Sequence, residues 1–121
     1  MANFAVTMAD GPRWDGARAI RDQDGWQAHA DFMDALVDDG FVIIGGPLGS
    51  GQRLIAVEAP DEQAVRDRLA ADPWVLAGLL RVSSVQPWSL WLDSRKTRIG
   101  TLTEAADKIV SAAEIGQVSA S

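Results

Sequence analysis

Four short apolar segments, most of them with alternating hydrophobic and polar positions, predict β-strands. They are residues 3–8, 41–44, 54–59 and 79–85. In the first segment, every second residue is a large hydrophobic one, as in a strand that buries one face. The second segment is apolar at every position, which is typical of a strand covered on both faces. A glycine-rich loop joins the second and third segments, and we expect these two strands to form a hairpin.

A helix is predicted between the first two strands, over residues 24–38. Apolar residues recur there every three to four positions and form a broad face that would pack on a sheet. Asp24 is the expected N-cap, Gln27 completes a capping box, and Gly40 is the expected C-terminal stop. The same segment carries the single histidine of the chain, His29.

A second helix is predicted after the hairpin, with Asp61 as its N-cap. It must end by Asp72, because Pro73 disfavours the helical conformation in the residue before it. Residues 86–92 are expected to extend the last strand or to form an edge. An alanine-rich helix is predicted over residues 101–115, followed by a frayed tail.

The order strand, helix, hairpin, helix, strand predicts an α+β fold. Two right-handed β-α-β crossovers around a central hairpin produce the ferredoxin-like, split β-α-β arrangement, a four-stranded antiparallel sheet with both helices on one face. The other face has no cover within this unit, so we expect a second copy to close it and form a homodimer. The expected domains are residues 1–94 for this fold and residues 95–121 for a C-terminal helical extension and tail.

The loop over residues 9–22 is long for a compact domain and carries Trp14 and three arginines, Arg13, Arg18 and Arg21. One interpretation is solvated charge around a packed indole. The alternative is a lid over a binding site.

Composition excludes several classes of function. With 121 residues the chain is long enough for one domain with its own core. Seventeen acidic and eleven basic residues make the net charge −6, which opposes binding to nucleic acid or anionic lipid. Zero cysteines and one histidine exclude thiolate and histidine-cluster metal sites. The start lacks a signal-peptide pattern and no window approaches the ~20 apolar residues of a membrane span, so we expect a cytoplasmic protein.

Several local patterns occur together and in a fixed order: GW-x2-H in the first helix, GGP after the second strand, ADPW at the corner after the second helix, and VQPW at the end. Together they resemble the YCII-related family, small members of the dimeric α+β barrel group, over residues 3–92. One branch of that family is similar to dehydrochlorinases that act on chlorinated hydroxyquinols. The arginine-bearing loop and the extension after Leu92 go beyond the shortest members, so the resemblance does not transfer the identity of a substrate.

The resemblance also implies a histidine and aspartate pair in a cavity beside the sheet, and the pair falls here on His29 and Asp72. In that role His29 transfers a proton, while Asp72 orients the ring and stabilises the imidazolium, without a metal or a cofactor. Each residue also has a structural interpretation. A single histidine on an apolar helix face is commonly a packed residue, and an aspartate before proline is a common turn residue.

Five further residues are candidates for substrate binding. Gly45 and Gly46, followed by Pro47, permit a positive φ or a close backbone approach, so that the glycine N–H groups could hold an oxyanion or a halide. The alternative is a strand end that needs a sharp turn. The other two, Trp26 and Trp74, could wall an aromatic pocket together with Trp88, or the three indoles could fill the core of the dimer.

Three functions remain open. The first is a cofactor-independent lyase or isomerase, dehydrochlorinase-like, that transfers a proton on a small oxygenated ring substrate. The second is a non-catalytic dimer that binds a small metabolite or serves as an accessory subunit. The third is a cofactor-free oxygenase of the kind found elsewhere among dimeric α+β barrels.

Overall fold

The computed structural model describes residues 1–94, and the helix predicted over residues 101–115 lies outside the described residues. The chain divides into a compact unit, Met1–Trp88, and a second unit that begins at Ser89. All the helices and strands of the described part belong to the first unit. The predicted division into residues 1–94 and 95–121 stays a prediction.

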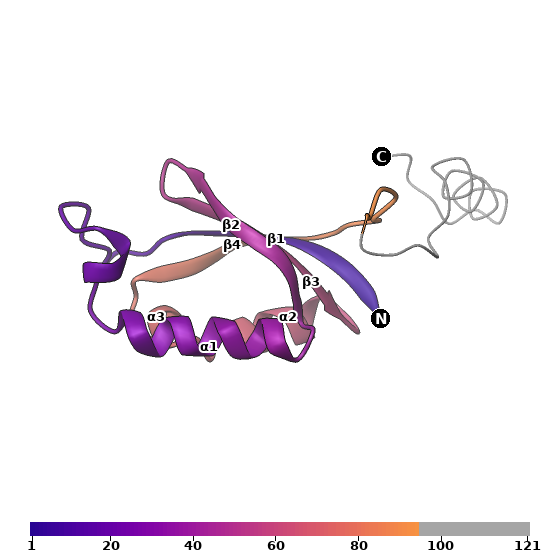
Figure 1. The fold of residues 1–121 in the computed structure, drawn as a ribbon, viewed down its shortest axis with the longest axis horizontal. Helices are drawn as coiled ribbons and strands as arrows, with labels where there is room; N and C mark the ends of the chain where they lie inside the picture. Colours follow the sequence, from indigo (N-terminus) through magenta and orange to yellow (C-terminus); the bar gives the residue numbers. More distant parts are fainter. Residues whose placement is uncertain (95–121) are drawn as a thin grey trace, which may run out of the picture. The chain divides into compact units, whose positions relative to one another are not determined.

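Four strands form one antiparallel sheet (Figure 1). They are β1 (Ala2–Asp10), β2 (Val42–Gly49), β3 (Gln52–Ala59) and β4 (Leu80–Pro87). Their order across the sheet is β2-β3-β1-β4, so that β1 and β3 are central and β2 and β4 are edges. This is the ferredoxin-like α+β arrangement that the order of elements predicts.

Three α-helices lie along one face of the sheet (Figure 1). They are α1 (Trp26–Asp38), α2 (Glu62–Leu69) and the single-turn α3 (Pro73–Leu76), and a 3-10 turn, η1 (Ile20–Asp22), precedes α1. No helix within residues 1–94 has the length and apolar character needed to cross a membrane.

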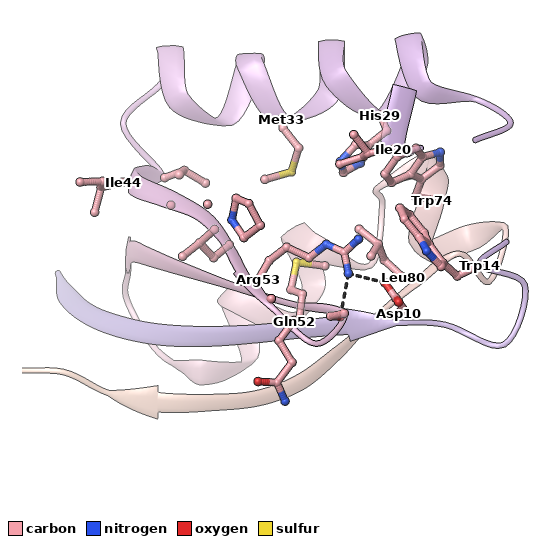
Figure 2. A pocket seen from close by; sticks show the side chains of 18 of the residues that line it. Asp10, Trp14, Ile20, His29, Met33, Ile44, Gln52, Arg53, Trp74 and Leu80 are labelled. Atoms are coloured by element: carbon pink, nitrogen blue, oxygen red, sulfur yellow. Dashed lines mark hydrogen bonds and ion pairs between the residues drawn. The ribbon is translucent and has the colours of Figure 1, made fainter. Parts of the chain in front are cut away.

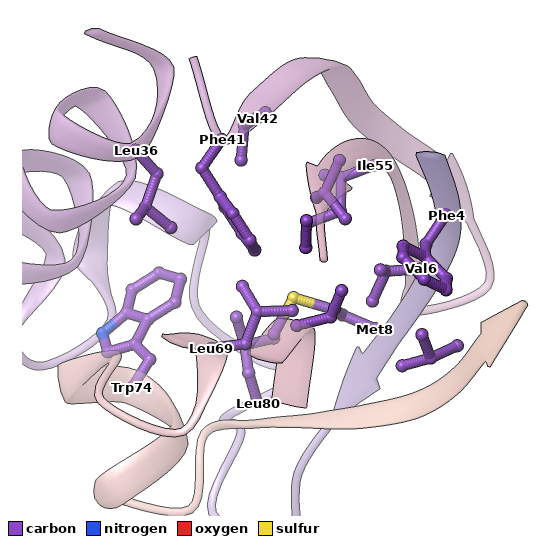
Figure 3. Close-up of a cluster of buried hydrophobic side chains, with 14 of the residues drawn as sticks. Phe4, Val6, Met8, Leu36, Phe41, Val42, Ile55, Leu69, Trp74 and Leu80 are labelled. Carbon is purple, nitrogen blue, oxygen red and sulfur yellow. The ribbon is translucent and has the colours of Figure 1, made fainter. Parts of the chain in front are cut away.

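A hydrophobic core fills the space between the helices and the sheet (Figure 3). Side chains of a strand alternate between its two faces, and Phe4, Val6 and Met8 of β1 all point into this core. The helices complete it with residues such as Leu69 and Trp74, which are almost fully buried. The alternation predicted for residues 3–8 is therefore confirmed.

The start of α1 differs from the prediction. Its N-cap is Gly25, in the left-handed conformation with φ 76°, and no side chain caps the helix. The Gln27 side chain donates instead to Asp31, one turn further along at 2.8 Å. The Asp24 carbonyl accepts a hydrogen bond from Trp74 Nε1 at 2.7 Å. The predicted capping box is wrong, because a tertiary contact with the tryptophan fixes the turn before the helix.

β2 runs past the predicted strand end. It continues through Gly45 and Gly46 to Gly49, and Gly45 lies opposite Ile55 of β3. Neither Gly45 nor Gly46 has a positive φ. A Cβ on Gly45 would overlap with the Ile55 side chain, so glycine is needed there for a close approach between strands. The predictions of a sharp turn and of a positive φ at Gly45 and Gly46 are therefore wrong. The predicted close approach of the backbone is found at Gly45.

Candidate functional site

A cavity of about 890 Å³ lies between α1 and the β2–β3 hairpin (Figure 2). Its volume falls in the range of roughly 300–1,000 Å³ that is usual for small-molecule sites. Six of the seven residues proposed from the sequence line it: Trp26, His29, Gly45, Gly46, Pro47 and Trp74. The seventh, Asp72, does not line the cavity but contacts His29.

His29 and Asp72 are brought together from positions 43 residues apart. His29 Nδ1 lies 2.9 Å and 3.0 Å from the two carboxylate oxygens of Asp72. A carboxylate can only accept hydrogen bonds, so Nδ1 donates and the neutral ring carries its free lone pair on Nε2. The contact thus selects the tautomer in which Nε2 can accept a proton.

Asp72 is held rigidly by the turn in which it lies. Its side chain is completely buried, and Oδ1 also accepts the backbone N–H of Trp74 at 2.9 Å. It is the N-cap of α3, and Pro73 occupies the first helical position, where a proline costs no hydrogen bond. The ADPW pattern therefore builds a helix cap whose carboxylate also orients the imidazole. Asp72 is both the turn residue expected before a proline and the partner of His29.

The other side of the His29 ring opens to the cavity. The imidazole stacks on Trp74 with centroids 4.0 Å apart and planes 6° from parallel, and the His29 side chain is 12% exposed. Nε2 has no hydrogen-bond partner within residues 1–94, and it is not among the buried unpartnered atoms of that part of the chain. Nε2 is therefore accessible to a molecule in the cavity.

Trp74 and Trp26 lie beside the imidazole, and a third tryptophan, Trp14, packs on Trp74. The Trp74 ring is contacted edge-on by Trp14, with centroids 5.5 Å apart, and at a tilt by Trp26, at 5.7 Å. Trp74 is 1% exposed and belongs to the core of its own chain. Trp14 was not proposed as a site residue from the sequence, although its loop was considered as a lid.

The loop before α1 is tied together by its own side chains. Gln23, only 3% exposed, accepts from the Asp15 N–H at 3.1 Å and donates to the Asp15 carbonyl at 2.7 Å. Arg18 binds the Asp15 and Asp24 carboxylates. The Asp24 hydrogen bond and charge raise the pKa of Arg18 above its usual range, with Asp15 adding to the effect. The charged side chains of the loop are exposed, as in the first interpretation, while Trp14 and Ile20 line the cavity. A role of the loop as a lid stays a prediction.

An ion pair on the cavity wall was also missed. Arg53 Nη1 lies 2.5 Å from Asp10 Oδ1, and both residues line the cavity. The alternation of β3 placed Arg53 on the same face as Ile55 and Val57, which point into the core. The position of a charged residue in an inward-facing row of the strand was the sequence feature that could have identified Arg53.

Replacing Trp74 by alanine should lower the free energy of unfolding by about 3–5 kcal/mol, the usual loss for a fully buried aromatic residue. Urea unfolding followed by circular dichroism measures this change. Trp88, which is 39% exposed and, against the interpretation as a pocket wall, does not line the cavity, is the matched control. Trp88→Ala should cost less than half as much. Equal losses in the free energy of unfolding for the two variants would mean that packing of Trp74 in the aromatic cluster does not stabilise the fold around the site.

The family model for the YCII-related domain matches residues 4–89. The chain belongs to the YCII-related family. The match confirms the resemblance proposed from the sequence patterns. No curated protein matches the chain.

A solved structure supports the YCII-type fold. The chain is similar to 5-chloro-2-hydroxyhydroquinone dehydrochlorinase (TftG) from Burkholderia phenoliruptrix AC1100, solved in complex with 2,5-dihydroxybenzoquinone. The TM-score is 0.52 at 22% sequence identity, and the match covers 78% of this chain and 98% of that one. At this identity the likeness shows the fold alone.

Within residues 1–94, no three histidine, cysteine, aspartate or glutamate side chains lie together so that they could hold a metal ion. The expectation of a site that works without metal or cofactor stays a prediction, as do the catalytic and binding roles of the lining residues.

Proposed function

We propose that this YCII-related protein is a cofactor-independent lyase of the dehydrochlorinase type, acting on a small chlorinated hydroxyquinol. The observation that carries the proposal is the His29 imidazole, held at Nδ1 by a buried carboxylate and open at Nε2 to a cavity of small-molecule size. The likeness to TftG, whose name states a dehydrochlorinase activity, supports the choice of substrate class.

The proposed reaction needs only proton transfers. His29 Nε2 accepts the proton of a ring hydroxyl, and the electron pair of that oxygen forms a ring carbonyl. In a preceding tautomerisation, the proton of another ring hydroxyl has moved to the chlorine-bearing carbon and left a ring carbonyl in place of that hydroxyl. The electron pair released when His29 takes the proton moves through the conjugated system, the C–Cl bond breaks and chloride leaves, and the proton held on Nε2 then passes to solvent. The substrate thereby loses hydrogen chloride, and its remaining atoms become a hydroxyquinone with no external oxidant. Asp72 stabilises the imidazolium that forms in between.

The cavity walls suit a flat ring. Trp26 is partly exposed beside His29, and a ring substrate can stack on or against its indole. Trp74, which is 1% exposed, supports the imidazole from its other face. On β2, Gly45 and Gly46 have no side chains and leave room in the wall. Binding of the departing halide by their N–H groups, as considered from the sequence, stays a prediction.

Chloride release tests the proposal. Purified protein is incubated under nitrogen with 5-chloro-2-hydroxyhydroquinone, without added metal or cofactor, and chloride is measured by ion chromatography against a protein-free blank. We expect one chloride per molecule of substrate consumed. Binding without chloride release would favour the non-catalytic module, and oxygen uptake in an aerated repeat would favour the cofactor-free oxygenase.

We also propose that the protein is a homodimer. All three α-helices of the unit Met1–Trp88 lie on one face of the sheet. The edge strand β2 exposes two large apolar side chains, Ile44 at 68% and Leu48 at 61%. Apolar side chains on an unpaired edge strand are commonly covered by another chain.

Sedimentation velocity should therefore find a particle of about twice the chain mass of 13.0 kDa at micromolar concentration. The reason is that pairing two sheets removes the exposed edge and the face without helices from water. The chain mass itself, found at every concentration up to the millimolar range, would contradict the dimer while leaving the proposed chemistry standing.

A further inference from the structure

A second polar group in the cavity has no part in the proton transfer. Arg53 lies near the start of β3 and extends its side chain into the space between the sheet and α1, with His29 on the helix across from it (Figure 2). Of the cavity-lining residues in the described part of the chain, Arg53 alone carries a permanent positive charge. Its side chain is 17% exposed, so the charge is largely removed from bulk water.

Only part of the guanidinium is used by the protein itself. Within residues 1–94 Nη1 makes both hydrogen bonds of the guanidinium, to Asp10 Oδ1 at 2.5 Å and to the Gly51 carbonyl at 2.8 Å. Nε and Nη2 have no partner within residues 1–94 and are not among the buried unpartnered atoms there. The edge formed by Nε and Nη2 is therefore an open two-donor fork, the geometry that binds a carboxylate through two parallel hydrogen bonds.

Several residues are arranged to hold this one side chain. Trp14 lies against the guanidinium, with its ring centroid 4.6 Å from Arg53 Cζ. Gly51 has φ +71°, and a Cβ there would lie 2.5 Å from Asp10 Oδ2, so the hairpin end requires glycine next to this ion pair. The Gly51 carbonyl also accepts the Asp10 N–H at 2.9 Å. The guanidinium is thus positioned before any ligand binds.

The partial neutralisation by Asp10 explains how the charge can be kept in a mostly apolar cavity. Asp10 is 34% exposed and balances the charge of Arg53 through one nitrogen. A ligand anion would not have to displace it, because the open edge lies on the other nitrogens. A delocalised anion with two oxygens fits such an edge better than a point charge or a neutral hydroxyl does.

We propose that Arg53 is the anion-recognition residue of this cavity, and that its ligands are monocyclic compounds bearing a delocalised oxygen anion, such as a benzoate or a hydroxyquinone anion. The ring lies among the tryptophans and the anionic end binds Nε and Nη2 of Arg53. The inference rests on the proposed function for the choice of a ring compound, but the recognition itself requires no turnover.

Equilibrium binding of benzoate and of benzamide, its neutral counterpart of the same shape, tests this role by isothermal titration calorimetry. The wild-type protein should bind benzoate more tightly. Arg53→Met should weaken benzoate binding about tenfold to a hundredfold, the usual loss of hydrogen bonds to a charged group, and change benzamide binding less than about twofold. Arg53→Lys keeps the charge without the fork and should lie in between.

Arg66→Met is the matched control, because Arg66 forms an exposed ion pair with Glu62 on α2 and does not line the cavity. It should leave both affinities unchanged. Equal benzoate affinity of the wild type and Arg53→Met, or no binding of benzoate by the wild type at millimolar concentration, would overturn the inference. If the Arg53→Met protein does not fold, the benzoate affinity of Arg53→Lys is the test. An affinity equal to that of the wild type would then overturn the inference.

The two proposals can fail separately. Arg53-dependent binding of benzoate together with no chloride release would overturn the lyase and keep the anion site. Chloride release together with a benzoate affinity that does not depend on Arg53 would keep the lyase and overturn the anion site.

Discussion

Glutamine in place of His29 should lower kcat for chloride release about a hundredfold to ten-thousandfold, the usual contribution of a general base. Glutamine can still donate a hydrogen bond to Asp72, so the buried carboxylate keeps a partner. Its amide cannot accept a proton from a ring hydroxyl, however, and it cannot stack on Trp74 as the imidazole does. Initial rates of chloride release measure the loss, and far-UV circular dichroism measures the fold.

Gln27→Ala is the control for this variant. Gln27 lies on the exposed side of α1 two residues before His29, and its side chain bonds only to Asp31 within the described residues. Its replacement should leave kcat unchanged. If the His29 variant kept more than about a tenth of the wild-type kcat, the imidazole would not be the base, because even a weak general base contributes more than that.

The fold was predictable because local patterns and long-range pairing agree. The strands predicted at 3–8, 54–59 and 79–85 all lie within or largely within observed strands, because their alternation reports a buried and an exposed face. The prediction was wrong where a tertiary contact overrides a local pattern. Pairing with β3 carries β2 on through Gly45 and Gly46, and the indole of Trp74 fixes the turn before α1.

The candidate site was predictable only in part. The pairing of His29 with Asp72 came from a family resemblance, since no local rule connects residues 43 positions apart. Their contact depends on how α1 packs against the turn before α3. Arg53 was overlooked for a different reason: it lies just before the strand predicted over residues 54–59, where a charged residue is usually solvated, and the alternation of β3 was not followed back to it.

Asparagine in place of Asp72 should lower kcat about a hundredfold to ten-thousandfold while leaving the cavity intact, since the wrong tautomer of a catalytic histidine has an effect of this size in serine proteases. The asparagine Oδ1 can still accept the Trp74 N–H, so the cap of α3 is kept. Its Nδ2, however, donates to His29 Nδ1 in place of an accepting carboxylate oxygen. We expect the ring proton to move to Nε2, which can then no longer accept a proton from the substrate, although the retained Oδ1, 2.9 Å from Nδ1, competes for the Nδ1 proton.

Nitrogen-15 chemical shifts of the imidazole report this change directly, because protonated and unprotonated ring nitrogens resonate far apart. Asp61→Asn is the matched control: Asp61 caps α2 by accepting the Ala64 N–H at 2.8 Å, and it does not line the cavity. The same chemical substitution there should change neither kcat nor the tautomer of His29. A protein with asparagine at position 72 and full kcat would reduce Asp72 to a helix cap. A low kcat with an unchanged tautomer would instead assign its effect to the charge that stabilises the imidazolium.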